Sequence, residues 1–520
     1  MGRKQEHELF VQNLTGCSSL TVFSVLACIA LFVFLDELLR LSWKKNLVSK
    51  KWTNFLLDFF VLVLPVLSTV TILSGWLTSL LIFLAITSLF ASAVRIALSS
   101  GMTRQKDDLQ VGEQAQAGRQ SLEFMVVSQF RGCVLLLACV TILAVDFPVF
   151  PRQMGKTERQ GYSVMDLGVG AFVIANALAA PQTKEMERSS WKMVVKEVQD
   201  TLVLLILGFS RFVSVLLTDY PVPEAEYGKH WNFFCTLAFV KILGRLAAVL
   251  VPPGAVAALG VCLAIVYECC LRLGLYSFVL DAADKAVPAS SSSIVQFLID
   301  NRSGLSSCLG FLAMFLMWLY VGRLFRNQRQ STAAILRLFQ DLALYSLVLY
   351  GATLMLPLPS RRVVNMSYMF WVSYQAMAFL AFTLLTRLLL VSIDQSSAVL
   401  LQSFDPRNVK SSLWNIYQAF QEGKFEVDLT SHRASLFTPT ILSAMNYNSM
   451  AIFLLANVLT GLINLSIDTT KCGDLVSMLI LTAYLTVITS AAYFLYRRNI
   501  RLPLRLASLR PFCLPKTKVK

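Results

Sequence analysis

The residues best suited to chemistry lie in one short block of the sequence. Asp146 opens the block and Asp166 closes it, and the loop between them carries Arg152, Lys156 and Arg159. A carboxylate can accept a proton from a hydroxyl group, while a neighbouring cation can bind an anionic group or stabilise developing negative charge. The block therefore favours a reaction at a hydroxyl of an anionic substrate. A salt-bridged helical hairpin is the structural alternative.

Two further polar clusters each stand immediately before an apolar run. The first is His230, Trp231 and Asn232, and the second begins with Asn301 and Arg302. Histidine can act as a base near neutral pH. The alternative is an aromatic segment at a membrane interface that happens to contain a histidine. From the residues alone, the interfacial aromatic segment is the favoured interpretation of the first cluster, and the second has no assigned role.

Asparagines recur late in the chain, at Asn446, Asn448, Asn457 and Asn464. An asparagine inside an apolar helix needs a hydrogen-bond partner, so these residues are predicted to join helices or to line a polar cavity. The sequence contains no P-loop, HExxH, GxSxG or Gly-rich dinucleotide motif, and its eleven cysteines include no CxxC pair. We therefore expect no metal and no bound cofactor.

The elements that must position these residues are membrane-spanning helices. The chain has 520 residues, of which 56% are hydrophobic and only 15% are charged. A soluble chain carries about 25% charged residues, and here the charges stand in clusters between apolar runs of about 20 residues, enough for a helix to cross a bilayer. Backbone groups in lipid must be satisfied within the segment, and the short alternating segments of a β-barrel are not evident. The sequence thus predicts an all-α, polytopic transmembrane bundle.

We predict about thirteen spans within one polytopic domain covering residues 1–520. Residues 390–448 are predicted to form a cytosolic amphipathic loop with helices along the interface, because they are too polar to span, and the alternative for one of these helices is docking on the bundle. Residues 496–520 are predicted to form a basic cytosolic tail. The predicted spans lie near residues 20–40, 55–74, 77–98, 128–147, 163–181, 200–218, 232–251, 254–273, 305–325, 338–357, 367–389, 449–467 and 474–495.

The distribution of Lys and Arg predicts the orientation. These residues concentrate in the segments after the odd-numbered spans, which places that face in the cytosol, the N-terminus in the lumen and the C-terminus in the cytosol. The same bias explains the net charge of +15, so a nucleic-acid partner is not needed to explain it. A glycosylation sequon at Asn13 agrees with a lumenal N-terminus. Lys516 and Lys518 resemble a retrieval signal of endoplasmic reticulum membrane proteins.

Across nearly the whole chain, these motifs resemble the glucosaminyl-phosphatidylinositol inositol acyltransferases of GPI-anchor biosynthesis. The resemblance is carried by residues 10–16, 146–170, 226–234, 360–362 and 454–466. It implies a protein of the endoplasmic reticulum membrane with about thirteen spans. The implied reaction moves an acyl chain, typically palmitoyl, from acyl-CoA as co-substrate to the inositol 2-hydroxyl of glucosaminyl-phosphatidylinositol. Two departures from the family pattern are Lys229, where a neutral residue is expected, and Ser303, where an acidic one is expected.

The resemblance also implies roles for individual residues. Asp146 and Lys156 match the residues associated with catalysis. As a hypothesis, Asp146 accepts the hydroxyl proton, and Lys156 pairs with Asp146, with the thioester oxygen or with a phosphate of acyl-CoA. His230 is the alternative base. The candidates for substrate binding are Arg131 and Arg152, which would steer phosphates, together with Tyr162, Asp166, His230, Trp231, Asn232, Arg302, Asn457 and Asn464.

Two other functions fit a polytopic bundle with charges inside its spans. A lipid transporter or flippase would look similar, although the internal symmetry common in transporters is not found. A scaffold of a membrane complex is less consistent with polar motifs gathered on one face. The predicted orientation also raises a difficulty, because acyl-CoA is made on the cytosolic side while the motifs are predicted to face the lumen. Either the CoA reaches through the bundle or the two sides are assigned the wrong way round.

Overall fold

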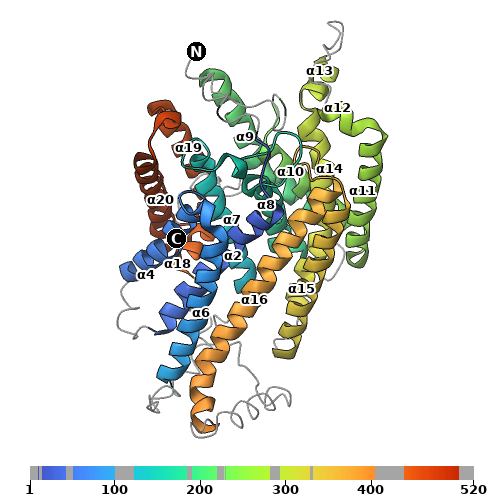
Figure 1. Cartoon of the computed structure of the whole chain (residues 1–520). Helices are drawn as coiled ribbons and strands as arrows, with labels where there is room; N and C mark the ends of the chain where they lie inside the picture. Colours follow the sequence, from blue (N-terminus) through green and yellow to red (C-terminus); the bar gives the residue numbers. More distant parts are fainter. Residues whose placement is uncertain are drawn as a thin grey trace, which may run out of the picture.

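The computed structural model describes residues 10, 14–42, 51–99, 122–183, 190–218, 228, 230–280, 293–327, 332–403 and 439–502. These residues form a bundle of long helices joined by turns (Figure 1). Within them, the one β-type contact is an isolated bridge between Cys17 and Tyr162. The predicted all-α class is confirmed.

The helices follow one another through the described chain, with short 3-10 or π segments at some turns and kinks. Their bounds are α2 (Ser19–Ser42), α4 (Lys51–Asp58), α5 (Leu64–Thr69), α6 (Leu77–Ser99), α7 (Leu122–Ala144), α8 (Val164–Ala179), α9 (Trp191–Thr218), α10 (Phe233–Leu250), α11 (Val256–Cys270), α12 (Tyr276–Leu280), α13 (Ser293–Asp300), α14 (Arg302–Asn327), α15 (Thr332–Met355), α16 (Met366–Ser403), α18 (Thr440–Tyr447), α19 (Ser449–Ser466) and α20 (Asp474–Arg497).

Eleven helical segments among the described residues are long and apolar enough to cross a membrane. The chain is therefore a polytopic membrane protein. The predicted span at 163–181 forms α8, which has 16 residues and is apolar but shorter than these eleven. The predicted span at 200–218 forms the second half of α9, which is outside the eleven. The number thirteen and the sides of the two termini stay predictions.

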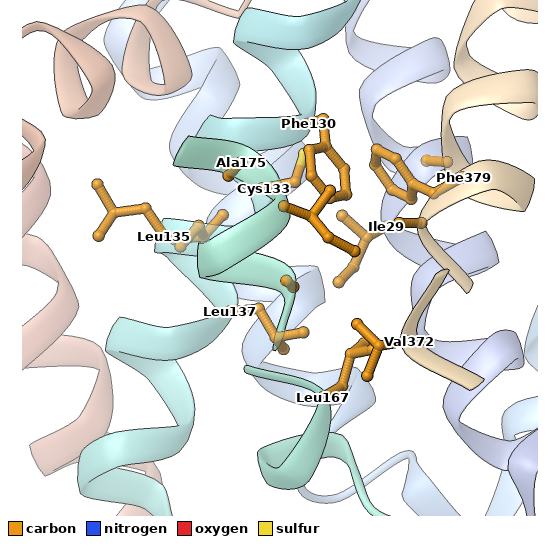
Figure 2. Packing of buried hydrophobic residues seen from close by; sticks show 14 of the residues in the cluster. Ile29, Phe130, Cys133, Leu135, Leu137, Leu167, Ala175, Val372 and Phe379 are labelled. Atoms are coloured by element: carbon orange, nitrogen blue, oxygen red, sulfur yellow. The ribbon is translucent and has the colours of Figure 1, made fainter. Parts of the chain in front are cut away.

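Helices α2, α7, α8 and α16 form the centre of the bundle, with α11 to α13 on one side and α19 and α20 on the other (Figure 1). In lipid, helices are held together by close packing and hydrogen bonds rather than by the hydrophobic effect. Gly170 of α8 illustrates this packing, because a Cβ atom there would lie 2.8 Å from Val372 of α16. Figure 2 shows Ile29, Phe130 and Phe379 meeting in the interior from three of these helices.

The predicted span at 367–389 is longer in the structure, since α16 continues to Ser403. Residues 404–438 of the predicted cytosolic loop lie outside the described residues, and α18 follows them. Helix α18 packs on α7 and α20 through Ile441, Leu442, Ala444 and Met445. The helix is thus part of the bundle rather than a surface segment.

A buried ionic cluster fastens the end of the bundle opposite the 145–163 loop. Arg40 of α2 contacts Asp36 (2.8 Å) and Asp58, and Asp58 also accepts a hydrogen bond from the backbone N–H of Ile441 at 2.6 Å. Beside this group, Arg387 of α16 pairs with Glu37 of α2 at 2.5 Å. The cluster joins α2, α4, α16 and α18, so it gives Asp58 the ion pair that a carboxylate inside a predicted span requires.

Candidate active site

Asp146 lies just beyond the C-terminal end of α7, and its side chain is buried against α19. The residue is 6% exposed, and its Oδ2 atom accepts a hydrogen bond of 2.7 Å from Nδ2 of Asn464. The apolar sequence around Asn464 predicts that it joins helices or lines a polar cavity, and this contact joins α19 to the residue that follows α7. Two of the candidate residues, 318 positions apart in the sequence, therefore lie together.

Arg152 fixes the first half of the loop that follows Asp146. Its guanidinium group donates hydrogen bonds of 2.9 Å to the carbonyl oxygens of Phe147 and Phe150, and it stacks over the Phe10 ring at 4.2 Å. Burial lowers the pKa of Arg152 to about 10, and the nearby charge of Asp146 opposes this shift. Arg152 therefore stays protonated at neutral pH and lies within electrostatic reach of Asp146.

Lys156 is half-buried between two anchored neighbours. On one side, the Gly155 N–H donates to the Arg152 carbonyl (3.0 Å). On the other, the Thr157 N–H donates to Oδ2 of Asp166 (3.1 Å). The backbone of Lys156 is thus held on both sides, which limits where its ammonium group can reach. Its catalytic role stays a prediction.

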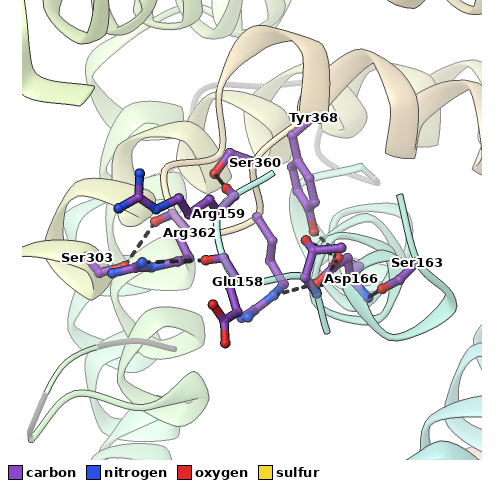
Figure 3. Close-up of polar contacts among 10 residues, drawn as sticks. Glu158, Arg159, Ser163, Asp166, Ser303, Ser360, Arg362 and Tyr368 are labelled. Atoms are coloured by element: carbon purple, nitrogen blue, oxygen red, sulfur yellow. Dashed lines mark hydrogen bonds and ion pairs between the residues drawn. The ribbon is translucent and has the colours of Figure 1, made fainter. Parts of the chain in front are cut away.

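Asp166 anchors the second half of the loop to α16 (Figure 3). It forms a buried ion pair with Arg361 at 2.8 Å and accepts a hydrogen bond of 2.6 Å from the Thr157 hydroxyl. Its own N–H donates to Ser163, the N-cap of α8, and its carbonyl oxygen accepts from Tyr368 (2.7 Å). Asp166 therefore holds the loop in place, and the two aspartates of the block have different partners.

The segment before α2 packs on the same loop. The Cys17 N–H donates to the Tyr162 carbonyl at 2.7 Å, and the Tyr162 ring contacts Trp371 edge-to-face at 5.4 Å. Gly16 has a φ of 85°, and a Cβ atom there would lie 2.6 Å from the Tyr162 carbonyl oxygen, so this position requires glycine. Burial raises the pKa of the free Cys17 thiol to about 12. Tyr162 is thus a contact between the loop, the N-terminal segment and α16.

The cluster at 230–232 has clear structural contacts. Asn232 caps α10 by accepting the Phe234 N–H (3.0 Å), and it donates to the Gly208 carbonyl at 2.8 Å. The backbone N–H groups of His230 and Trp231 both donate to the Asn301 side chain at 2.8 Å. These contacts join the cluster to the turn before α14. The structure thus places His230 beside α13 and α14, while Asp146 contacts α19.

Three other candidates lie elsewhere. Arg131 is fifteen positions before Asp146 on α7, and at about 1.5 Å per residue it lies roughly 20 Å deeper in the bundle. Arg302 donates to the carbonyl oxygens of Val279 and Ile299 at 3.3 and 3.2 Å. Asn457 is exposed and donates to the Phe453 carbonyl of its own helix. The structure brings none of these three to Asp146, and this contact of Asn457 lies within its own helix.

A partly open apolar cavity lies between α2, α7, α8 and α16, and its empty volume of about 500 Å³ includes space open to the surroundings. Its lining includes Ile29, Phe130, Leu137, Leu167 and Phe379, which Figure 2 shows facing the same interior. Val164 and Gly168, at the start of α8, also line it, so one part of the cavity lies next to the loop that carries Lys156. A cavity of this lining suits a hydrocarbon chain.

A family model described as GWT1 matches residues 3–495 of the chain. The chain belongs to the GWT1 family. It is 32% identical to GPI-anchored wall transfer protein 1 of Aspergillus oryzae, over 96% of this chain and 99% of that protein. It is 29% identical to the glucosaminyl-phosphatidylinositol-acyltransferase PIGW of Bos taurus, again over 96% and 99%. An uncharacterized protein of Arabidopsis thaliana is 33% identical over 85% of this chain.

Two features of this GWT1-family protein were missed by the sequence analysis. One is Arg361 as the partner of Asp166, since the two residues are 195 positions apart. Arg361 does stand in a polar motif before an apolar run, which is the signal that could have led to it. The other is the apolar cavity. Its lining residues come from four separate helices, and in the sequence they look like the residues of ordinary helix packing.

Proposed function

We propose that this GWT1-family protein is an inositol acyltransferase of GPI-anchor biosynthesis. It would move a fatty acyl chain, typically palmitoyl, from acyl-CoA to the inositol 2-hydroxyl of glucosaminyl-phosphatidylinositol in the endoplasmic reticulum membrane. The names of the bovine and fungal relatives support the pathway and the reaction class. The observation that carries the proposal is the environment of Asp146. Its carboxylate is buried, is oriented by Asn464, and precedes a cationic loop that lies next to the apolar cavity.

The chemistry assigns one task to each group. Asp146 accepts the proton of the inositol hydroxyl as its oxygen attacks the thioester carbonyl carbon. The carbonyl oxygen gains negative charge, and Lys156 stabilises that charge by donating a hydrogen bond. The carbon–sulfur bond then breaks, and CoA leaves as a thiolate that takes up the proton. Asn464 acts through Asp146 by orienting its carboxylate. Arg152 places a positive charge within electrostatic reach of that carboxylate.

The apolar cavity would hold the acyl chain of the donor. Its aliphatic and aromatic lining offers dispersion contacts along the chain and no charged group. Because α8 begins directly after the loop, a chain lying against Val164 and Gly168 would bring its thioester toward Lys156. In this arrangement, the depth of the cavity limits the length of the acyl chain that can bind.

Filling the cavity should therefore shorten the preferred acyl chain. Gly168 lines the cavity, and a Cβ atom there would meet nothing within 4 Å. In Gly168→Leu, we expect kcat/KM for palmitoyl-CoA to fall about tenfold or more relative to a shorter donor such as octanoyl-CoA. The loss corresponds to roughly 1–3 kcal/mol of chain contacts. Rates measured across a series of acyl-CoA lengths would check this.

The matched control is Gly351→Leu on α15, where a Cβ atom would also meet nothing within 4 Å. Gly351 does not line the cavity, so this variant should keep the wild-type order of donors. An unchanged order in Gly168→Leu would contradict the assignment of the cavity to the acyl chain.

The function itself is tested with purified protein, acyl-CoA and glucosaminyl-phosphatidylinositol. We expect a product heavier by one acyl chain and an equal release of CoA thiol. A lipid transporter or flippase would instead move the glycolipid across a vesicle membrane without changing its mass. Movement without acylation would overturn the proposal.

A further inference from the structure

Four arginines gather at the side of the loop away from α19. Arg361 and Arg362 precede α16, Arg302 begins α14, and Arg159 belongs to the loop. Ser303 donates a hydrogen bond to the Arg362 carbonyl (3.3 Å), Arg362 donates to the Glu158 carbonyl (3.4 Å), and Ser360 donates to the Arg159 carbonyl. In Figure 3, the guanidinium groups of Arg159 and Arg362 extend to the same side, away from Asp166.

Within the part of the chain that the structure describes, the carboxylates of Asp166 and Glu158 only partly balance the positive charge of this group. Asp166 neutralises Arg361 in their buried ion pair. Burial and the like charges of Arg361, Arg302 and Arg159 lower the pKa of Arg362 to about 10, with Glu158 opposing this shift. The Nε atom of Arg362 is buried and has no hydrogen-bond partner among the described residues. A buried donor without a partner is costly, and so are like charges held close together.

The surroundings of the arginines point to a membrane lipid. Helix α13 comes directly before Arg302 and carries exposed Ile294, Phe297 and Leu298. On the neighbouring segment, Leu273 is 87% exposed and Phe278 is also exposed. Apolar side chains on a short amphipathic helix at the end of a bundle typically lie at the boundary between acyl chains and headgroups. Arg302 comes directly after α13, so a helix lying at that boundary would bring lipid phosphates to it.

We propose that Arg159, Arg302 and Arg362 form a binding site for the phosphodiester of an inositol phospholipid that reaches the protein sideways from the bilayer, along α13. Arginine suits this ligand because its planar guanidinium group binds two phosphate oxygens at once. The site is distinct from the group formed by Asp146 and Asn464, which contacts α19. The proposal concerns lipid binding, and only the assignment of the site to the glycolipid substrate rests on the proposed acyl transfer.

The direct test is binding of phosphatidylinositol to the purified full-length protein in detergent, measured by native mass spectrometry. We expect Arg302→Gln/Arg362→Gln to weaken binding at least tenfold, or about 1.4 kcal/mol, because both substitutions remove charge-assisted hydrogen bonds to the phosphate. Arg159→Gln changes an exposed residue of the site, so it should not affect folding. Weaker phosphatidylinositol binding by this variant would therefore reflect the loss of a contact with the lipid. Arg272→Gln is the control, since that side chain is 65% exposed and pairs with Glu268.

Steady-state kinetics identify the source of the phosphate. A raised KM for glucosaminyl-phosphatidylinositol with an unchanged KM for acyl-CoA would assign the site to the glycolipid substrate. Weaker phosphatidylinositol binding with both KM values unchanged would assign it to a resident phospholipid. Wild-type phosphatidylinositol binding in Arg302→Gln/Arg362→Gln would overturn the proposal. A rise confined to the KM for acyl-CoA would also overturn it.

Discussion

Replacing Asp146 with asparagine is expected to lower kcat for inositol acylation by about 10²–10⁴-fold, the usual contribution of a positioned general base. The substitution removes the proton acceptor and keeps the shape of the side chain. An amide oxygen can still accept the hydrogen bond from Asn464 that holds the carboxylate in the wild-type protein. Initial rates at saturating concentrations of both substrates would measure the effect.

Two comparisons make the Asp146→Asn result specific. Asp468→Asn removes a carboxylate from the turn between α19 and α20, where Asp468 pairs with the largely exposed Lys471, so we expect a near wild-type rate. The thermal unfolding midpoint of Asp146→Asn should stay close to that of the wild type. A variant that is folded and still acylates inositol at a near wild-type rate would show that Asp146 is not the base.

Replacing Arg361 with methionine is expected to destabilise the protein by about 3–5 kcal/mol, because it leaves the buried Asp166 carboxylate without its ion-pair partner. The two hydrogen bonds from Thr157 to Asp166 remain and favour the lower end of this range. The loop would loosen around Lys156, so activity should fall together with stability. Denaturant titration of the detergent-solubilised protein would measure the free energy of unfolding.

A double substitution separates the ion pair from simple loss of packing. Asp166→Asn/Arg361→Met removes both charges, so its destabilisation should be smaller than the sum of the two single losses. Arg498→Met, at an exposed position after α20, should change stability by less than about 0.5 kcal/mol. Strict additivity of Asp166→Asn and Arg361→Met would contradict a direct interaction between the two side chains.

The membrane class and most helix positions could be predicted because they depend on local composition. A run of about 20 apolar residues identifies a span wherever it occurs in the chain. The block around Asp146 could also be found locally, since its charges stand together in the sequence. Helix α16 is longer than predicted, because the mixed polar and apolar residues after Leu389 continue the helix to Ser403 although they are less apolar than a span.

The contacts between distant residues could not be predicted in this way. Asp146 and Asn464 are 318 positions apart, and the sequence suggested only that Asn464 needed some partner. The pairing of Glu37 with Arg387 was missed because both stand near the predicted ends of spans, where charges are expected to face water. Arg131 was grouped with the phosphate-binding residues by its charge alone, although its helical position places it roughly 20 Å deeper.

The most direct test of the acyl-transfer mechanism is a comparison of wild-type protein with Asp146→Asn, using isotope-labelled acyl-CoA and glucosaminyl-phosphatidylinositol. Tandem mass spectrometry of the product would locate the labelled chain. The mechanism predicts label on the inositol ring with wild-type protein, an equal release of CoA thiol, and at least 100-fold slower appearance of product with the variant. Label that never reaches the inositol ring with wild-type protein, or that reaches it equally fast with the variant, would contradict the mechanism.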